Sequence, residues 1–211
     1  MADDHALMRR GIKTLLESHT GWEICGEART GRDAVAKAET LKPDIVILDI
    51  SMPDLNGVDA ARRIRKISPD TELLILSIHY SDQLIREIPK AGVRGYIVKS
   101  DSDRDLVIAV ETLANHKPFF TSRATEIILR DFHGEKNQGE PSNLADASLT
   151  SREREIIQLI AEGKSSNTIA SCLYISPKTA ETHRANIMRK LKLHSKPELV
   201  RYAIRNRIID Q

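Results

Sequence analysis

The stretch Pro43-Asp44-Ile45-Val46-Ile47-Leu48-Asp49 decides the fold of this 211-residue chain. It is short, apolar and rich in β-branched side chains, which is typical of a strand covered on both faces of a parallel sheet. Asp49 closes it, at the carboxyl end where open α/β sheets place their ligand crevice. An acid at the end of one strand is more often a cap or a turn former, so its interpretation depends on the rest of the chain.

Polar residues close other apolar segments in the same way. Glu72–Leu76 is followed by Ser77, Gly95–Val98 by Lys99, and the chain opens with Asp3-Asp4 directly after Met1 and Ala2. Helical patterns fall between these segments, at about 5–18, 31–41, 57–67, 81–91 and 103–116. Strands that alternate with helices predict a doubly wound α/β fold with a parallel sheet, whose crossovers bring all carboxyl ends to one edge.

The residues expected at that edge favour phosphoryl chemistry. The carboxylates of Asp3, Asp4 and Asp49, with the backbone carbonyl of Ser51, form an oxygen-rich set that suits a hard divalent cation, best Mg²⁺. Such a cation would neutralise charge on an incoming phosphoryl group and leave Asp49 to attack phosphorus. Lys99 and the hydroxyl of Ser77 could then hold the phosphoryl oxygens. Each residue alone also has an ordinary structural role, as a cap, a turn former or a surface lysine.

These motifs together resemble the receiver domain of bacterial response regulators. The resemblance covers about residues 2–116 and is carried by Asp3-Asp4-His5, Asp49, Met52-Pro53, Asn56-Gly57, Ser77, Gly95-Tyr96 and Lys99. It implies a phosphoacceptor at Asp49 and a metal-binding acidic pair at Asp3 and Asp4. It also implies that Ser77 is the switch hydroxyl, Tyr96 the switch aromatic and Lys99 the phosphate-binding lysine.

The start of the chain departs from the pattern of this family. A receiver has a flavodoxin-like sheet in the order 2-1-3-4-5, and its first strand precedes the acidic pair. Here only Met1 and Ala2 stand before Asp3. We expect the strands near Trp22–Ala28 and Asp44–Asp49 to face an unpaired edge, at a cost of roughly 1–3 kcal/mol per buried polar group. The sequence therefore predicts a missing or truncated first strand, and it puts phosphorylation in doubt if the native protein starts at Met1.

Charge divides the chain into an acidic part and a basic part. From Ser148 onward it has twelve Lys and Arg against six Asp and Glu, a net charge of +6, while the preceding part has twenty against twenty-four, a net charge of −4. This asymmetry indicates a polyanionic partner for the second part. Cys25 and Cys172 lack metal-ligand spacing, and no apolar run is long enough for a membrane helix, so we expect a cytoplasmic protein without a membrane partner.

Between the two parts the composition is typical of a linker. Residues 133–147 (HGEKNQGEPSNLADA) are rich in glycine and polar residues, and residues 122–132 have the pattern of a short connecting helix. We predict a first domain at 1–116, a linker at 117–147 and a second, all-α domain at 148–211.

Four short helices are predicted in the second domain. Thr150 opens the first with a capping box, and the third begins with Ser176 as its cap and Pro177 at its first position. The second and third helices, joined by a turn, describe a helix-turn-helix whose second helix has a polar, cationic outer face. A charged solvent face on an ordinary four-helix domain is the alternative from this pattern alone.

The sequence of this segment resembles the LuxR-type DNA-binding domain. Because it follows a receiver-like domain, the whole chain resembles a NarL/FixJ-type response regulator. The carrying residues are Leu149–Glu153, Ile169-Ala170, Ser176–His183 and Lys190-Leu191. The resemblance implies contacts to double-stranded DNA, with Glu181, Thr182 and Ala185 at base edges. The other expected DNA-binding residues, mainly at phosphates, are Lys178, Thr179, Arg184, Arg189 and Lys190.

The sequence thus predicts a transcription regulator that a histidine kinase phosphorylates on Asp49 and that binds DNA as a homodimer. RNA polymerase is a further candidate partner. We expect no enzymatic activity apart from accepting the phosphoryl group and hydrolysing it again. Two alternatives stay open: a phosphorylation-independent DNA binder with a crippled receiver, and an aspartyl-phosphate phosphatase. The phosphatase is disfavoured because those enzymes usually need a second Asp where this chain has Ser51.

Overall fold

The structure is a computed structural model that describes residues 1–78, 80–100, 103–132, 149–206 and 208–209. The chain forms two compact units, Met1–Lys136 and Asn137–Gln211, which we describe separately. None of the described helices is both long enough and apolar enough to cross a membrane.

The first unit alternates helices and strands. In chain order its elements are α1 (Ala6–Glu17), α2 (Gly31–Leu41), β1 (Ile45–Asp49), α3 (Gly57–Ile67), β2 (Glu72–Ser77), α4 (Asp82–Lys90), β3 (Gly95–Val98), α5 (Asp103–Ala114), β4 (Phe119–Phe120) and α6 (Ser122–Phe132). The four strands form one parallel sheet in the order β1-β2-β3-β4. The predicted doubly wound sheet and its helices are confirmed, whereas the short strand β4 was not predicted.

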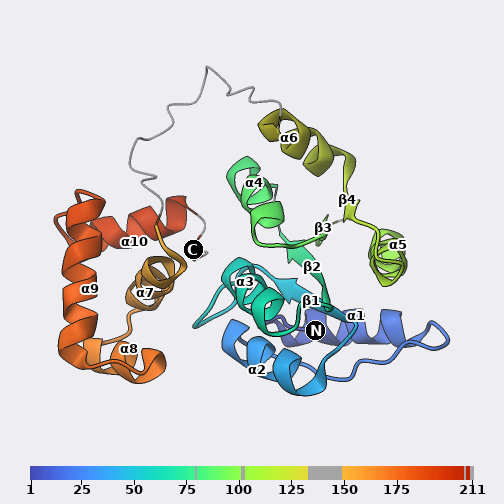
Figure 1. Cartoon of the computed structure of the whole chain (residues 1–211), viewed down its shortest axis with the longest axis horizontal. Coiled ribbons are helices and arrows are strands. Elements are labelled where there is room, and N and C mark those ends of the chain that lie inside the picture. Colours follow the sequence, from blue (N-terminus) through green and yellow to red (C-terminus); the bar gives the residue numbers. More distant parts are fainter. Residues whose placement is uncertain (79, 101–102, 133–148, 207, 210–211) are drawn as a thin grey trace. The chain divides into compact units, whose positions relative to one another are not determined.

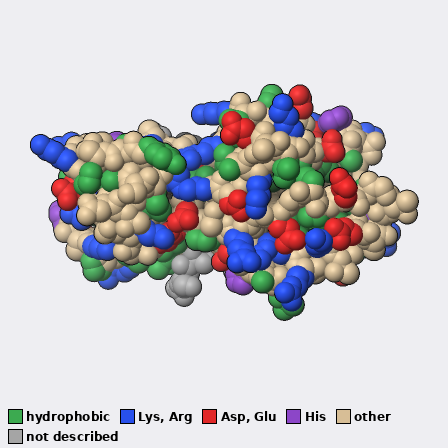
Figure 2. Space-filling view, turned by 90° about the horizontal axis from the view of Figure 1, so that it is seen from below, with side chains coloured by type: hydrophobic (Ala, Val, Ile, Leu, Met, Phe, Trp, Pro, Cys, Tyr) green, Lys and Arg blue, Asp and Glu red, His purple; other side chains and the backbone are tan. Residues whose placement is uncertain are grey.

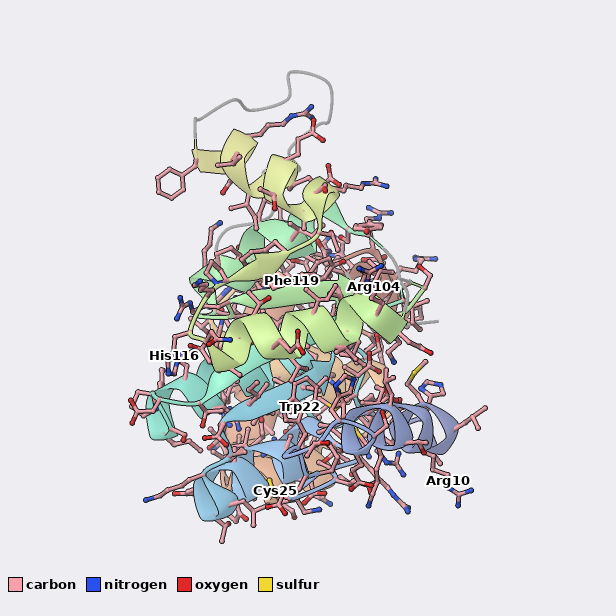
Figure 3. All side chains as sticks on the ribbon, turned by 90° about the vertical axis from the view of Figure 1, so that its right-hand side faces the viewer. Arg10, Trp22, Cys25, Arg104, His116 and Phe119 are labelled. Carbon is pink, nitrogen blue, oxygen red and sulfur yellow. The ribbon has the colours of Figure 1, made fainter. Side chains whose placement is uncertain are left out.

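Helices cover both faces of the sheet, as Figure 1 shows. Side chains alternate along each strand: Leu48 and Ile75 point to the side of α2, α3, α4 and α6, while Ile47 and Leu76 point to the side of α1 and α5. In Figure 3, α5 lies across the strands with Arg104 near its beginning and His116 just beyond its end. Burial on both faces explains why β1 reads as a continuous apolar run rather than an alternating one.

The edge expected to be open is partly filled by the start of the chain. Ala2 pairs in parallel with both Ala28 and Leu48, and its N–H donates to the carbonyl of Ile47 at 2.8 Å. The expected strand near Trp22–Ala28 is wrong, because only Ala28 makes a strand-like pairing there. The expectation of two unpaired edges is likewise wrong at the carboxyl ends. There Met1 and Asp3 pair with the backbone of Ala28, and Ala2 pairs with the backbone of β1. The five-strand order 2-1-3-4-5 expected of a receiver is therefore not observed. The sheet has the order β1-β2-β3-β4, and Ala2 makes only isolated bridges beside it.

A small pocket lies beside β1, closer to its amino end than the pairing of Ala2. It is lined by Met1, Ala2, Gly26–Ala28, Ala34, Lys37, Ala38, Leu41, Pro43 and Ile45-Val46, with Cys25 at its side. The amino group of Met1 borders it and donates to the carbonyl of Gly26 at 2.7 Å. Burial lowers the pKa of that amino group.

The second unit is a small helical domain. Its described helices are α7 (Ser151–Ala161), α8 (Ser166–Leu173), α9 (Pro177–Lys190) and α10 (Lys196–Arg205). The predicted capping box at Thr150 and Glu153 is present, and Ser176 caps α9 with Pro177 in its first turn. A core that includes Ile157 and Ile187 holds the four helices together.

The connection between the units is described only in part. The predicted connecting helix is confirmed as α6, which packs on the first unit through Ala124 and Ile127. The rest of the predicted linker, from residue 133 to 147, lies outside the described residues.

Candidate functional site

Asp49 occupies the carboxyl end of β1, as the sequence predicts. Its backbone N–H donates to the carbonyl of Ala2 at 2.8 Å, and its Cα is in register with Leu76 of β2. The side chain is 1% exposed, and neither carboxylate oxygen accepts a hydrogen bond from any described residue. A buried carboxylate without hydrogen bonds is costly, because ionised groups lose their hydration on burial. The ammonium of Lys99, 3.0 Å from Oδ2 of Asp49, offsets part of this cost, and a divalent cation or an electrophile would offset more.

Lys99 faces Asp49 from the end of β3 and is also close to the start of the chain. Its ammonium nitrogen lies 2.7 Å from Oδ2 of Asp3 and 3.0 Å from Oδ2 of Asp49. All three side chains are buried, with Lys99 itself 8% exposed. The N–H of Lys99 also donates to the carbonyl of Ser77 at 2.6 Å. The structure thus brings together four of the segment ends that the sequence placed at one edge.

The pKa values in this cluster shift in the directions that burial and charge require. Burial raises the pKa of Asp49, the ammonium of Lys99 opposes this, and the nearby charges of Asp3 and Asp4 raise it further. For Lys99, burial alone would lower the pKa, but the hydrogen bond to Asp3 and the charge of Asp49 outweigh it and raise the pKa. Lys99 consequently stays protonated and positively charged, whereas the site disfavours the ionised form of Asp49.

The acidic cluster fits a divalent cation. One carboxylate oxygen each of Asp3, Asp4 and Asp49 lies within 4.8 Å of the others, and Lys99 supplies one compensating positive charge at ion-pair distance. About two negative charges are then left, which equals the charge of one Mg²⁺ ion. Ser51, whose carbonyl was predicted as a further ligand, lies in the partly buried bend that follows β1. Asp4 is exposed and opens the cluster to solvent.

A tight loop fixes the other side of Asp49. Asn56 caps α3 by accepting a hydrogen bond from the N–H of Asp59 at 2.9 Å. Gly57 donates its N–H to the carbonyl of Ile50 at 2.8 Å, and a Cβ at Gly57 would lie 2.0 Å from the carbonyl oxygen of Asp49. Only glycine allows α3 to begin this close to the backbone of the site.

The two predicted switch residues lie on neighbouring strands. Ser77 is buried at the end of β2, and Tyr96 is fully buried in β3, in register with Ile75. The ring of Tyr96 lies 6.3 Å from the ring of Tyr80, and the guanidinium of Arg123 lies 4.8 Å above that second ring. Arg123 belongs to the first turn of α6, so an aromatic contact links the strand that carries Lys99 to the connecting helix.

Sequence reasoning assigned no role to two residues that the structure places at this site. The Nδ1 atom of His5 lies 2.8 Å from Oδ1 of Asp4 and joins the acidic cluster. Arg9 is buried one turn into α1 and donates to the carbonyl of Asp3 at 2.8 Å. Adjacency in Asp3-Asp4-His5 was a visible signal for the first residue. The role of Arg9 had no local signal, because it depends on how α1 turns back over the strand end.

The predicted DNA-binding residues lie on the outer side of the second unit. Ala180 and Ile187 of α9 face the core, whereas the eight predicted residues are all exposed: Lys178, Thr179, Glu181, Thr182, Arg184, Ala185, Arg189 and Lys190. The hydroxyl of Thr182 donates to the carbonyl of Lys178 at 2.9 Å. Figure 2 shows Lys and Arg side chains scattered over the visible surface. The exposed, cationic outer face of α9 is as predicted; its contacts with DNA stay a prediction.

Lys190 departs from the simple picture of a free phosphate ligand. Its ammonium lies 2.8 Å from Oε2 of Glu153, in the capping box of α7. Partial burial opposes ionisation of Glu153, but hydrogen bonds from Lys190 and Thr150 outweigh it and lower the pKa of that carboxyl. Any contact of Lys190 with a phosphate would have to exchange this partner.

Both halves of the chain match known protein families. Residues 1–111 match the family described as response regulator receiver domain, and residues 147–203 match the bacterial regulatory proteins of the luxR family. The oxygen regulatory protein NreC of Staphylococcus epidermidis is 36% identical over 213 residues, which is 100% of this chain and 98% of that protein.

Solved structures agree with this division. A LuxR-family two-component response regulator from Aurantimonas is similar with 27% identity and a TM-score of 0.59, over 63% of this chain and 94% of that one. RcsB from Salmonella enterica, solved on a promoter with a phosphomimetic, is similar with a TM-score of 0.62 over 95% of both chains. Its identity is 23%, so it supports the fold alone.

Proposed function

The chain belongs to the response regulators that join a receiver domain to a LuxR-type DNA-binding domain, and we propose that Asp49 is the residue whose phosphorylation controls it. The observation that carries this assignment is the buried carboxylate of Asp49, which accepts no hydrogen bond from the described residues and lies 3.0 Å from the ammonium of Lys99. An oxygen of Asp49 would attack phosphorus while the bond from phosphorus to the donor breaks. The expected donor is a phosphohistidine of a histidine kinase or a small phosphodonor.

Asp3, Asp4 and Asp49, with the carbonyl of Ser51, would hold Mg²⁺ beside this reaction. The cation would supply positive charge for the oxygens of the phosphoryl group. Asp3 has a second function, because its pairing with Lys99 at 2.7 Å positions that ammonium next to Asp49. Arg9 in turn holds the backbone carbonyl of Asp3, so the acid is fixed from two directions.

Lys99 would turn from the carboxylates to the phosphoryl oxygens once the bond to Asp49 has formed. Its raised pKa keeps it charged, and its ammonium is already within contact of Asp49. The hydroxyl of Ser77 comes from the neighbouring strand end, and the carbonyl of Ser77 accepts the N–H of Lys99 at 2.6 Å. Movement of either residue therefore affects the other through the backbone.

The ring contacts suggest how the change would reach the DNA-binding unit. Tyr96 would follow the movement of Ser77, and its neighbour Tyr80 is covered by Arg123 of α6. α6 is the last described element before the second unit. Replacing Arg123 by alanine should leave phosphorylation of Asp49 intact and weaken its effect on DNA binding, because it removes the contact between α6 and the Tyr80 ring. The variant is needed because spatial contiguity alone does not prove coupling.

In the second unit, α9 would enter the major groove. Glu181, Thr182 and Ala185 would face base edges, while the phosphate contacts would come from Lys178, Thr179, Arg184, Arg189 and Lys190. Two protomers would occupy half-sites about one helical turn apart, because both recognition helices must meet the same face of the duplex. A contact with RNA polymerase would follow from binding near a promoter.

One experiment separates this proposal from its alternatives. The full chain is incubated with acetyl phosphate and Mg²⁺, and intact mass is followed over time with Asp49→Asn as the control. A slowly hydrolysing adduct that the variant lacks supports the regulated switch. Absence of an adduct in the wild type would indicate a crippled receiver. Continuous release of inorganic phosphate without an accumulating adduct would indicate a phosphatase.

A further inference from the structure

We infer that the imidazole of His5 is a nitrogen ligand of the divalent-cation site, which therefore favours first-row transition metal ions such as Mn²⁺ or Zn²⁺ over Mg²⁺. This inference rests on the proposed metal site at Asp3, Asp4 and Asp49. It concerns a residue that the acidic ligand set does not include.

The position of the ring is the first argument. One ligand atom each of Asp3, Asp4, His5 and Asp49 lies within 4.8 Å of every other. Ligands about 2.0–2.2 Å from a common metal ion are at most about 4.4 Å apart. Four atoms 4.8 Å apart lie about 2.9 Å from their common centre, so the groups need to move inward by at most about 0.9 Å each to share one ion. The Nδ1 atom of His5 is 2.8 Å from Asp4 and 3.5 Å from Asp3, measured to Oδ1 in each case.

The backbone explains why the ring points toward the acids. His5 stands at the N-cap of α1, yet its side chain makes no capping hydrogen bond. Its backbone N–H instead donates to Oδ1 of Asp3 at 2.8 Å. Common N-cap residues such as Ser, Thr, Asp and Asn turn their side chains back to the helix. At this position the ring is left free of that task, and the turn directs it to the carboxylates.

The burial of Asp49 supports a cation at this cluster, because the ammonium of Lys99, 3.0 Å away, balances only one of the three carboxylates. Asp49 is 1% exposed, and both of its oxygens lack a hydrogen bond from the described residues. A solvated acidic patch would not contain such a group. The His5 ring is 63% exposed, so it can approach an ion without a buried rearrangement.

The ligand chemistry sets the preference. Mg²⁺ takes oxygen ligands and gives up water reluctantly. Imidazole suits Zn²⁺, Cu²⁺, Fe²⁺ and Ni²⁺, and divalent first-row ions generally bind mixed nitrogen and oxygen sites more tightly than Mg²⁺. A site with oxygen ligands alone would bind first-row ions in preference to Mg²⁺ less strongly than a site that includes an imidazole. Replacing His5 should therefore change the ratio of two affinities more than it changes the affinity for Mg²⁺.

The test measures that ratio on the full chain. Metal-free protein is titrated with Mn²⁺ and, separately, with Mg²⁺ by calorimetry, for the wild type, His5→Gln and the control His194→Gln in the other unit. We expect His5→Gln to lose about tenfold or more in Mn²⁺ affinity, by analogy with losses around metal sites, and to change less than about twofold toward Mg²⁺. The control should match the wild type for both ions.

A direct readout needs no variant. Pulsed electron spin resonance of the wild type with bound Mn²⁺ should show coupling to a ¹⁴N nucleus, and His5→Gln should lack it. Absence of nitrogen coupling in the wild type, or equal losses toward both ions in the variant, would overturn the inference. Phosphorylation by acetyl phosphate is measured separately with each ion, so failure of Asp49 to accept phosphate is distinguishable from failure of His5 to bind metal. Melting of both variants without metal confirms that they fold.

Discussion

Asp49→Asn should make the first unit more stable when no cation is present. The wild-type carboxylate is buried, and burial together with the charges of Asp3 and Asp4 raises its pKa more than the ammonium of Lys99, 3.0 Å away, lowers it. Asparagine removes the charge and keeps the shape. Lys99 is not orphaned by the change, since Asp3 remains 2.7 Å from its ammonium.

The size of the effect follows from the groups involved. The two side chains have the same shape and differ in charge, so the gain is the cost of keeping Asp49 ionised against burial and the charges of Asp3 and Asp4. The lost attraction of Lys99 at 3.0 Å offsets part of that gain, so the free energy of unfolding should rise by about 1–2 kcal/mol. For a unit of this size that is an increase of roughly 3–10 °C in melting temperature. A cation at about a hundred times its Kd would stabilise the wild type by about 2.7 kcal/mol. Saturating Mg²⁺ should therefore remove or reverse the advantage of the variant, which has lost a ligand.

The pH dependence gives a second signature of the same group. Because the pKa of Asp49 is raised from its ordinary value of 3.8, the folded state binds its proton more tightly than the unfolded state does. Asp49 then makes the wild type lose stability as the pH rises from about 4 through the folded-state pKa, and the variant lacks this contribution. The difference in stability between the two proteins should grow across that window and then level off.

The assay follows the fluorescence of Trp22, the single tryptophan of the chain, which lies in the first unit and reports its unfolding. Melting is measured in chelator and in Mg²⁺, from about pH 4 to about pH 7, to span the window above. If the variant melts below the wild type in chelator, or if the difference is the same at all pH values, the assigned cost of ionised Asp49 is wrong.

Four other variants have expected outcomes. Gly57→Ala places a Cβ 2.0 Å from a carbonyl oxygen at the site, so melting followed at Trp22 should show a loss of roughly 1–3 kcal/mol and intact mass should show little phosphoryl adduct. Lys99→Met leaves the two buried carboxylates beside it uncompensated, and the loss of roughly 3–5 kcal/mol in chelator should be partly recovered by Mg²⁺ in the same melting assay. In salt-titrated binding to a selected and a scrambled duplex, Thr182→Ala should reduce specificity by roughly 1–3 kcal/mol. In that assay Lys190→Ala should weaken both complexes and reduce the salt slope by about one counterion, and the reverse outcome would exchange the two roles.

Much of the fold and the composition of the site could be predicted from the sequence, because each depends on local patterns. Strands covered on both faces read as apolar runs, and the helix bounds follow caps such as Thr150, Ser176 and Asn56. Parallel topology then brings the strand ends together without further information. The pairing of Met1, Ala2 and Asp3 with two neighbouring segments could not be predicted, because so short a stretch leaves no periodic pattern.

Contacts set by side-chain direction were also beyond the sequence. The partners of Lys99 are distant along the chain, and nothing in the pattern around Lys190 points to Glu153, 37 residues earlier. The two-residue strand β4 is too short to show alternation. In each case the missing information is a distance between elements rather than a preference within one.

In each unit, a lysine that is expected to bind a phosphate is paired with a carboxylate of the same unit. Lys99 pairs with Asp3 and Asp49, and Lys190 pairs with Glu153. The pair of Lys190 and Glu153 is partly exposed, with 31% and 18% of the side chains accessible, so it is worth at most about 1 kcal/mol and a DNA phosphate can replace the carboxylate at little cost. Lys99 is different, because Asp3 and Asp49 are both buried and its departure would leave Asp3 uncompensated. A divalent cation beside Asp3 removes that penalty. The exchange at Lys99 should therefore require the cation, whereas the exchange at Lys190 should depend on ionic strength alone.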